Sequence, residues 1–118
     1  MTDYIWKNRV LIIFTPDNKH TEYTKQTAIL KLNKAGMLER DMVTIIIYAD
    51  NSVMIDDVTQ QQLTPNSFHQ YYDQSANEFS VFLIGKDNGV KLRQNQAVTP
   101  SDLFELIDAM PMRQHEML

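Results

Sequence analysis

The chain has 118 residues, a net charge of -4 at pH 7 and no cysteine. This length fits a single domain spanning residues 1–118, and the acidic balance argues against nucleic-acid binding, which needs a basic face. Thiol–disulfide exchange and thiol-peroxidase chemistry require a thiolate, so the absence of cysteine excludes both, together with disulfides and thiolate zinc sites.

Nothing in the sequence indicates insertion into a membrane. The longest apolar runs, residues 10–14 and 45–48, are far too short to span a bilayer. Residues 1–9 are polar and lack the basic, apolar and cleavage regions of a signal peptide. We therefore expect no membrane insertion and no signal peptide in this chain, and the sequence leaves the compartment open.

The first half of the chain predicts a strand, a helix and a second strand. Residues 10–14 and 43–48 are short, rich in β-branched residues and apolar on both faces, which is typical of buried strands in a parallel sheet. Between them, residues 21–35 carry Ala28, Ile29, Leu32 and Ala35 at helical spacing, and Gly36 follows as a C′ residue. This order predicts a right-handed βαβ unit.

The middle of the chain predicts an irregular segment and then a helix. Residues 50–62 are polar, with a short apolar contact at residues 53–55. A second helix is predicted to begin at Thr64, because Thr is a good N-cap, Pro65 fits the first turn and Leu63 can pack on Phe68.

A β-hairpin is predicted after that helix. Residues 79–84 indicate another buried strand, and Asn88–Gly89 is the preferred pair for a type I′ turn. The return strand at residues 90–93 alternates apolar and basic residues, which suits the edge of a sheet.

The last predicted helix begins at Thr99–Pro100 and is stopped or bent by Pro111. Its apolar residues recur at helical spacing, which predicts a core-facing stripe of Leu103, Leu106, Ile107 and Met110. The order β-α-β-α-β-β-α predicts an α/β fold with a four-stranded mixed sheet flanked by helices, which is the minimal thioredoxin-like arrangement.

Several short stretches resemble a known family. They are Trp6 with residues 8–9, then residues 39–41, 83–87, 89–93 and 107–113. Together they resemble the P-DUDES family, a thioredoxin-like domain of unknown function found in bacterial proteins and in vertebrate extracellular-matrix and sushi-repeat proteins. The resemblance implies a thioredoxin-like fold, no established enzymatic activity, and a binding or adhesion role in an exported protein.

The loop after the first strand is where thioredoxins carry their reactive dithiol, at a helix N-terminus. Here residues 15–20 offer the hydroxyl of Thr15, the carboxylate of Asp17 and the imidazole of His20. One interpretation is a thiol-independent enzyme or redox-accessory protein, with Thr15 as a nucleophile that needs a base. The other interpretation is a simple turn at a helix start.

Charged residues at the predicted strand ends, hairpin and last helix are the candidate binding residues. Guanidinium groups among them could bind a carboxylate or phosphate with paired hydrogen bonds. The alternative is an intramolecular salt-bridge network in which Lys91 and Arg93 block further strand pairing. The full set is Arg40, Asp41, Lys86, Asp87, Lys91, Arg93, Asp108 and Arg113.

The C-terminal residues Met110, Met112, His115 and Met117 bear soft ligands that suit Cu(I), so copper handling is a further alternative. The other interpretation is that Met110 completes the helix stripe and the last residues fray. We expect no cofactor or metal.

The sequence favours a non-catalytic binding module whose partner is an unidentified protein or a small anionic ligand. A homodimer is left open.

Overall fold

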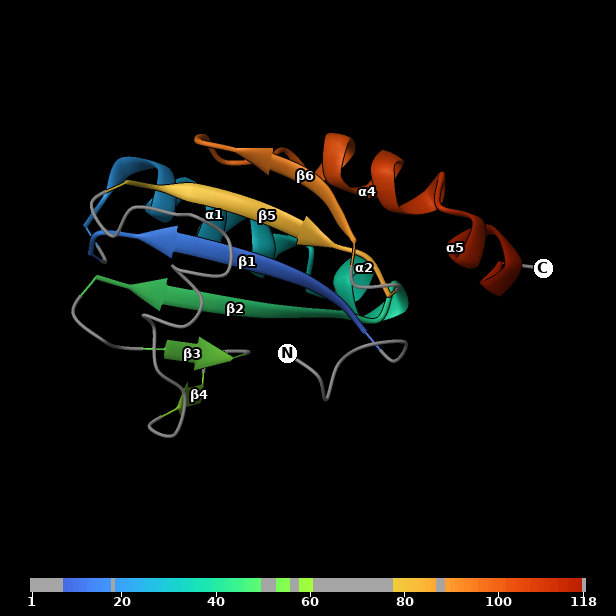
Figure 1. Ribbon diagram of the computed structural model, residues 1–118, viewed down its shortest axis with the longest axis horizontal. Helices are drawn as coiled ribbons and strands as arrows, with labels where there is room; N and C mark the ends of the chain where they lie inside the picture. Colours follow the sequence, from blue (N-terminus) through green and yellow to red (C-terminus); the bar gives the residue numbers. More distant parts are fainter. Residues whose placement is uncertain are drawn as a thin grey trace.

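The computed structural model describes residues 8–17, 19–49, 53–55, 58–60, 78–86 and 89–117. Its centre is formed by three strands without an exposed residue: β1 (Arg9–Thr15), β2 (Met42–Tyr48) and β5 (Ser80–Ile84). β1 is parallel to β2 and antiparallel to β5, and β6 (Val90–Gln94) is antiparallel to β5 at the sheet edge (Figure 1). These four strands confirm the predicted mixed sheet and its thioredoxin-like order.

Two short strands extend this sheet beyond β2. β3 (Val53–Ile55) pairs antiparallel with β2, and β4 (Val58–Gln60) pairs antiparallel with β3. The full order is β4-β3-β2-β1-β5-β6. The expectation of an irregular segment was therefore wrong at these residues, because β3 adds onto the edge that β2 would otherwise expose. The helix predicted from Thr64 lies outside the described residues, as do Asp87 and Asn88 of the predicted turn.

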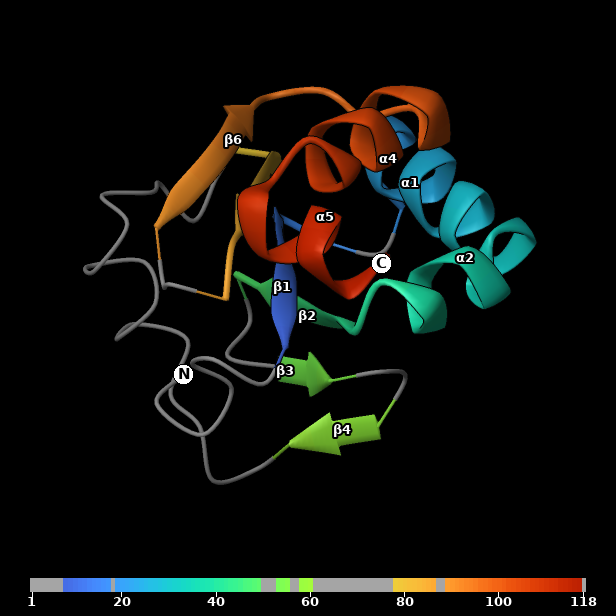
Figure 2. The same cartoon turned by 90° about the vertical axis from the view of Figure 1, so that its right-hand side faces the viewer.

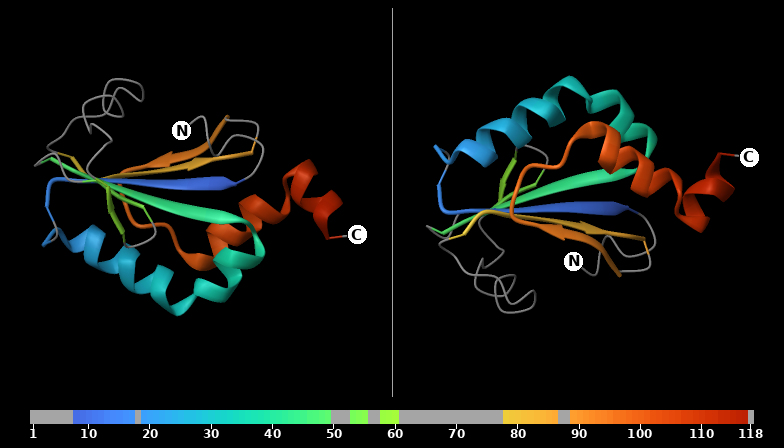
Figure 3. Two further views of the ribbon diagram at one scale, coloured as in Figure 1. Left: turned by 90° about the horizontal axis from the view of Figure 1, so that it is seen from below. Right: turned by 90° about the horizontal axis from the view of Figure 1, so that it is seen from above.

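The described helices are α1 (Thr21–Leu32), α2 (Lys34–Glu39), α4 (Pro100–Asp108) and α5 (Pro111–Glu116). Figure 3 shows α1, α2 and α4 together on one face of the sheet, with α5 beyond its end. Among these helices none is long and apolar enough to cross a membrane.

The predicted first helix is divided in two. It ends at Leu32, and Gly36 lies inside α2 instead of at a helix end. A Cβ on Gly36 would lie 2.9 Å from Cζ of Phe104, so the glycine permits the close approach of α2 to α4. The left-handed conformation after α2 is taken by Asp41, whose φ is 54°. Asp and Asn tolerate this region better than most residues.

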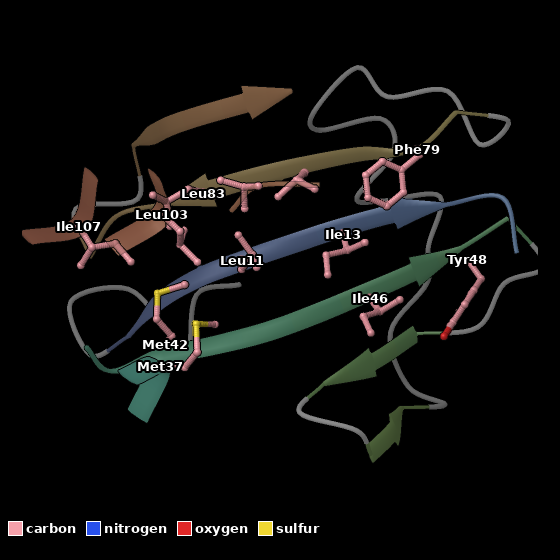
Figure 4. Packing of buried hydrophobic residues seen from close by; sticks show 12 residues of the cluster. Leu11, Ile13, Met37, Met42, Ile46, Tyr48, Phe79, Leu83, Leu103 and Ile107 are labelled. Atoms are coloured by element: carbon pink, nitrogen blue, oxygen red, sulfur yellow. The ribbon is translucent and has the colours of Figure 1, made fainter. Parts of the chain in front are cut away.

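The core has two sides. On the helix-covered side, residues from the strands and from α2 and α4 form one cluster (Figure 4), which includes Leu11, Met37, Ile46, Leu103 and Ile107. On the opposite side, the intervening strand residues form a second buried cluster that includes Ile12, Phe14, Ile45 and Phe82. Both faces of the central strands are thus buried, as their continuous apolar pattern predicted.

The predicted helix stripes were partly wrong. In α4, Leu103 and Ile107 are buried and Met110 packs on the core, whereas Leu106 is exposed.

In α1, Ala28 and Leu32 are exposed and the buried residue is Gln26. Its side-chain amide donates to the carbonyl of Val98 (3.2 Å) and accepts from the Val98 amide (2.7 Å). A polar residue can occupy this core position because both ends of its amide are satisfied.

Candidate functional site

Charged side chains from both ends of the described chain meet where β1 and β2 begin and β5 ends. Figure 2 views the molecule from this end, with α5 in front of the sheet. Arg9 opens β1, Lys86 follows β5, and Asp108 closes α4. We call this group the ion-pair cluster; it comprises Arg9, Glu39, Arg40, Asp41, Lys86, Asp108, Arg113 and Glu116.

The first half of the cluster is built on the carboxylate of Glu116. The fully buried guanidinium of Arg9 donates to it through Nη1 (3.2 Å) and Nη2 (3.1 Å), and Nη1 also donates to the carbonyl of Arg40 (3.0 Å). Nζ of Lys86 donates to Glu116 (2.7 Å) and to Asp41 (2.8 Å). Nε of Arg9 is buried and has no hydrogen-bond partner among the described residues.

The second half is built on the carboxylate of Asp108. Arg40 donates to both oxygens of Asp108, at 3.0 and 2.9 Å, and Nε of Arg113 donates to Oδ1 at 3.0 Å. Nη2 of Arg113 donates to the Glu39 carboxylate at 3.0 Å. Arg113 also lies 3.8 Å from Glu116, which links the two halves.

The pKa values of the cluster reflect this mutual pairing. Hydrogen bonds from Arg40 and Arg113 lower the pKa of Asp108 below its usual value despite partial desolvation. Burial alone would raise the pKa of Glu116, but the hydrogen bonds from Arg9 and Lys86 outweigh it and lower that pKa. Burial alone would lower the pKa of Lys86, yet its bonds to Asp41 and Glu116 raise it. All three groups are therefore held in their charged forms.

The cluster contains four cations and four carboxylates, each with a partner inside the chain. Lys86 and Arg113 are buried, and Arg40 stacks its guanidinium 4.0 Å from the centre of the Phe104 ring. The arrangement therefore holds α5 and α4 against the start of the sheet, and an external anion would have to displace a carboxylate of this chain.

Five of the eight predicted binding residues belong to this cluster: Arg40, Asp41, Lys86, Asp108 and Arg113. Their contacts match the intramolecular alternative, and their role in binding a partner stays a prediction. Sequence reasoning did not select Arg9, Glu39 or Glu116 as site residues. One sequence feature could have identified Arg9 as a site residue: it is a charged residue directly before a fully apolar strand.

The other predicted binding residues lie elsewhere. Lys91 and Arg93 are exposed on β6, and the guanidinium of Arg93 lies 4.8 Å from the centre of the Phe82 ring. Asp87 lies outside the described residues.

In the loop after β1, the polar side chains form hydrogen bonds with nearby backbone groups. The hydroxyl of Thr15 is buried and donates to the carbonyl of Asp17 (2.8 Å), and the Asp17 carboxylate accepts from the Lys19 amide (2.8 Å). Nδ1 of His20 accepts from the Glu22 amide (3.2 Å) as the N-cap of α1, and its ring stacks on Phe79. These contacts match the turn interpretation, because they do not join the Thr15 hydroxyl to the His20 ring as nucleophile and base.

The C-terminal soft ligands do not share one environment. Met110 packs on the core, whereas His115 and Met117 are exposed, and the side chain of Met112 lies outside the described part. Within the described residues, no group of three or more His, Cys, Asp or Glu side chains could hold a metal ion.

Comparison with known structures places the fold. The chain superposes on thioredoxin peroxidase I of Plasmodium yoelii with a TM-score of 0.71 and 18% identity, covering 99% of this chain and 79% of that one. A reduced 2-Cys peroxiredoxin of Plasmodium vivax gives a TM-score of 0.70 and 16% identity, covering 100% and 85%. The predicted thioredoxin-like fold is therefore confirmed.

Comparison with known sequences identifies relatives. The chain is 26% identical over 114 residues to sushi repeat-containing protein SRPX2 of Homo sapiens, and 28% identical over 115 residues to sushi repeat-containing protein SRPX of Rattus norvegicus. These alignments cover 94% and 95% of this chain, but 24% and 25% of the relatives. The chain thus spans about a quarter of the length of the curated relatives it matches.

A family pattern described as a domain of unknown function, DUF4174, matches residues 1–116. The chain belongs to the DUF4174 family, and its fold is thioredoxin-like.

Proposed function

We propose that this domain is a non-catalytic interaction module of the P-DUDES type, which binds an extended acidic segment of a protein partner along the edge strand β6. The observation that carries the proposal is the composition and position of this strand. β6 is the last strand of the described sheet, it presents Lys91 and Arg93 as exposed residues, and its five residues include no acid.

The geometry of an edge strand explains why the partner would be extended. An edge offers backbone amides and carbonyls to one more strand, and alternate side chains of that strand then meet those of the sheet. Lys91 and Arg93 are two residues apart and both are exposed, and the pairing of β6 with β5 shifts register beside Lys91, between Leu92 and Val90. An added strand with acidic residues at alternate positions would place opposite charges beside both, and such cross-strand pairs stabilise a sheet.

The same geometry disfavours pairing between two copies of this chain through β6. In an antiparallel pair centred on Leu92, Lys91 of one copy would lie opposite Arg93 of the other. Like charges directly opposite each other are destabilising. A shift of one residue places each cation opposite Val90, Leu92 or Gln94 and still supplies no carboxylate. We therefore favour an acidic partner over a homodimer at this edge.

The rest of the molecule supports a binding role without catalysis. The chain has no cysteine, and the polar groups after β1 cap α1 and shape its turn. The cations of the ion-pair cluster have carboxylate partners within the chain, so an external anion would have to displace one of them there. The resemblance to domains of extracellular-matrix proteins and the sushi-repeat relatives support an exported setting.

Two synthetic peptides test the proposal. One alternates Glu with Val, the other alternates Lys with Val, and both have neutral ends. Fluorescence anisotropy measures their affinity, and amide chemical shifts locate the bound peptide. We expect only the Glu peptide to bind, and the changes in amide chemical shift to be concentrated in β6. Added salt should lower the affinity of this peptide, because it screens the charge pairs.

Paired variants separate a local effect from overall charge. Replacing Lys91 and Arg93 with Ser should lower the affinity for the Glu peptide about tenfold, because two cross-strand charge pairs together contribute about 1 kcal/mol or more. The control replaces Lys19 and Lys25 with Ser, which removes the same charge outside β6. Equal losses in both variants, or a Lys91/Arg93 variant that loses stability and keeps its affinity, would refute the role of β6.

A further inference from the structure

A groove lies between α1, α2 and β2, on the helix-covered side of the sheet. Its volume is about 350 Å³, which falls within the range of small-molecule sites. Its apolar lining includes Leu30, Met37 and Met42, of which the two methionines are buried in the core. Leu38 forms part of its wall and is 67% exposed.

The groove follows from how the helices cover β2. The helix-facing residues of β2 are Met42, Thr44, Ile46 and Tyr48, and all are buried except Thr44. The helical layer changes course at Asn33, where α1 ends and α2 begins. Thr44 therefore lines an open groove instead of lying under a helix.

Two lysines lie on the lining of this groove. Lys31 is in the last turn of α1 and Lys34 is the first residue of α2, and both are exposed. Within the described part of the chain, neither ammonium group has a carboxylate partner. Lys25 and Lys86, by contrast, pair with carboxylates of this chain.

We propose that this groove binds an amphipathic carboxylate, with a hydrocarbon chain on Leu30, Met37 and Met42 and its carboxylate between Lys31 and Lys34. Both parts of the ligand follow from the lining. A small hydrophilic anion would leave the apolar floor hydrated, and a neutral hydrocarbon would leave the two ammonium groups without a counter-charge.

This site is separate from the surface proposed for the acidic segment. The groove lies between the helices and β2, and β1 and β5 separate β2 from β6 in the sheet. The two proposals therefore fail independently, and binding of a carboxylate in the groove leaves β6 accessible.

Straight-chain carboxylates of six to twelve carbons, below their micelle concentrations, test the site by calorimetry on the full chain. Each methylene that enters an apolar groove should raise affinity by about fourfold, which corresponds to about 0.8 kcal/mol. The alcohol of equal length should bind about tenfold more weakly, because it lacks the charge. Affinity that does not rise with chain length, or an alcohol that binds as tightly, would overturn the proposal.

Variants at exposed leucines localise the binding without disturbing the core. Leu38→Glu places a carboxylate on the groove wall and should abolish binding of decanoate. Leu32→Glu is the matched control, because Leu32 is 86% exposed and does not line the groove. We expect this control to bind within about threefold of the parent.

The lysines have their own matched pair. Replacing Lys31 and Lys34 with Gln should reduce decanoate affinity to that of decanol, whereas replacing Lys19 and Lys25 with Gln should leave it unchanged. Equal effects of the two leucine variants, or of the two lysine pairs, would show that any binding is not in this groove.

Discussion

Arg9 donates two hydrogen bonds to the carboxylate of Glu116, although 107 positions separate the two residues in the chain. The guanidinium is fully buried, whereas the side chain of Glu116 is 25% exposed. The pair therefore fixes a helix near the C-terminus to the first residue of the central strand.

Glu116→Gln should destabilise the fold by about 2 kcal/mol. The change leaves the buried charge of Arg9 without its counter-ion, and breaking a buried pair at one side is costly. Because Glu116 is partly exposed, the expected loss in free energy of unfolding is smaller than that for breaking a fully buried ion pair. Urea unfolding measures it, and Glu105→Gln, at an exposed site on α4, is the matched control. Equal stability of the two variants would show that the Arg9–Glu116 contact contributes nothing.

Stability should fall in acid. The pKa values of Asp108 and Glu116 are lowered in the folded chain from ordinary values of 3.8 and 4.5. Groups of this kind contribute stability above their unfolded pKa, and the contribution is lost as pH falls through the folded pKa. The free energy of unfolding should thus decline progressively from about pH 5 downward.

Urea unfolding at a series of pH values measures this decline. Glu116→Gln should make the acid slope shallower, because one titrating group is gone. Asp102→Asn serves as the comparison, because Asp102 is an exposed carboxylate on α4 outside the ion-pair cluster. A parent stability that is flat between pH 5 and pH 3 would contradict the role of the cluster.

Gly36→Ala should destabilise the chain by about 1 kcal/mol, although alanine favours a helix over glycine by a similar amount. The added methyl would lie 2.9 Å from Cζ and 3.0 Å from Cε2 of Phe104, so the ring on which Arg40 stacks would have to shift. In a Phe104→Ala background, the same substitution should stabilise the protein instead. Thermal unfolding of the four proteins tests this reversal, and an unchanged sign would refute the steric explanation.

Thr99→Ala should cost about 1 kcal/mol. The Thr99 hydroxyl accepts a hydrogen bond from the Asp102 amide (3.2 Å) and caps α4. Ser101→Ala, in the first turn of the same helix, should have a much smaller effect. Urea midpoints compare the two; similar losses would show that the cap contributes no more than an ordinary surface residue.

The sequence predicted those elements whose signals are local. Apolar runs with β-branched residues identified β1, β2 and β5, and the basic alternation of residues 90–93 identified an edge strand. Thr99 followed by Pro100 located the start of α4 to the residue. Each signal depends on spacing along a few residues, so no knowledge of distant contacts was needed.

Features that depend on distant contacts were missed. Gly36 suggested a helix end, but its role is set by Phe104, which follows much later in the chain. Gln26 is buried because the backbone of Val98 satisfies it. The partners of Arg9 and Glu116 could not be inferred, because no local spacing relates the two ends of a chain.

The bond between Arg9 and Glu116 also bears on how such a domain is joined to others. Among the described residues, the start of β1 at Arg9 and the end of α5 at Glu116 lie within hydrogen-bonding distance of each other. In relatives where the matched segment is about a quarter of the whole, this proximity would let it be inserted as a cassette, with the preceding and following segments leaving from neighbouring points.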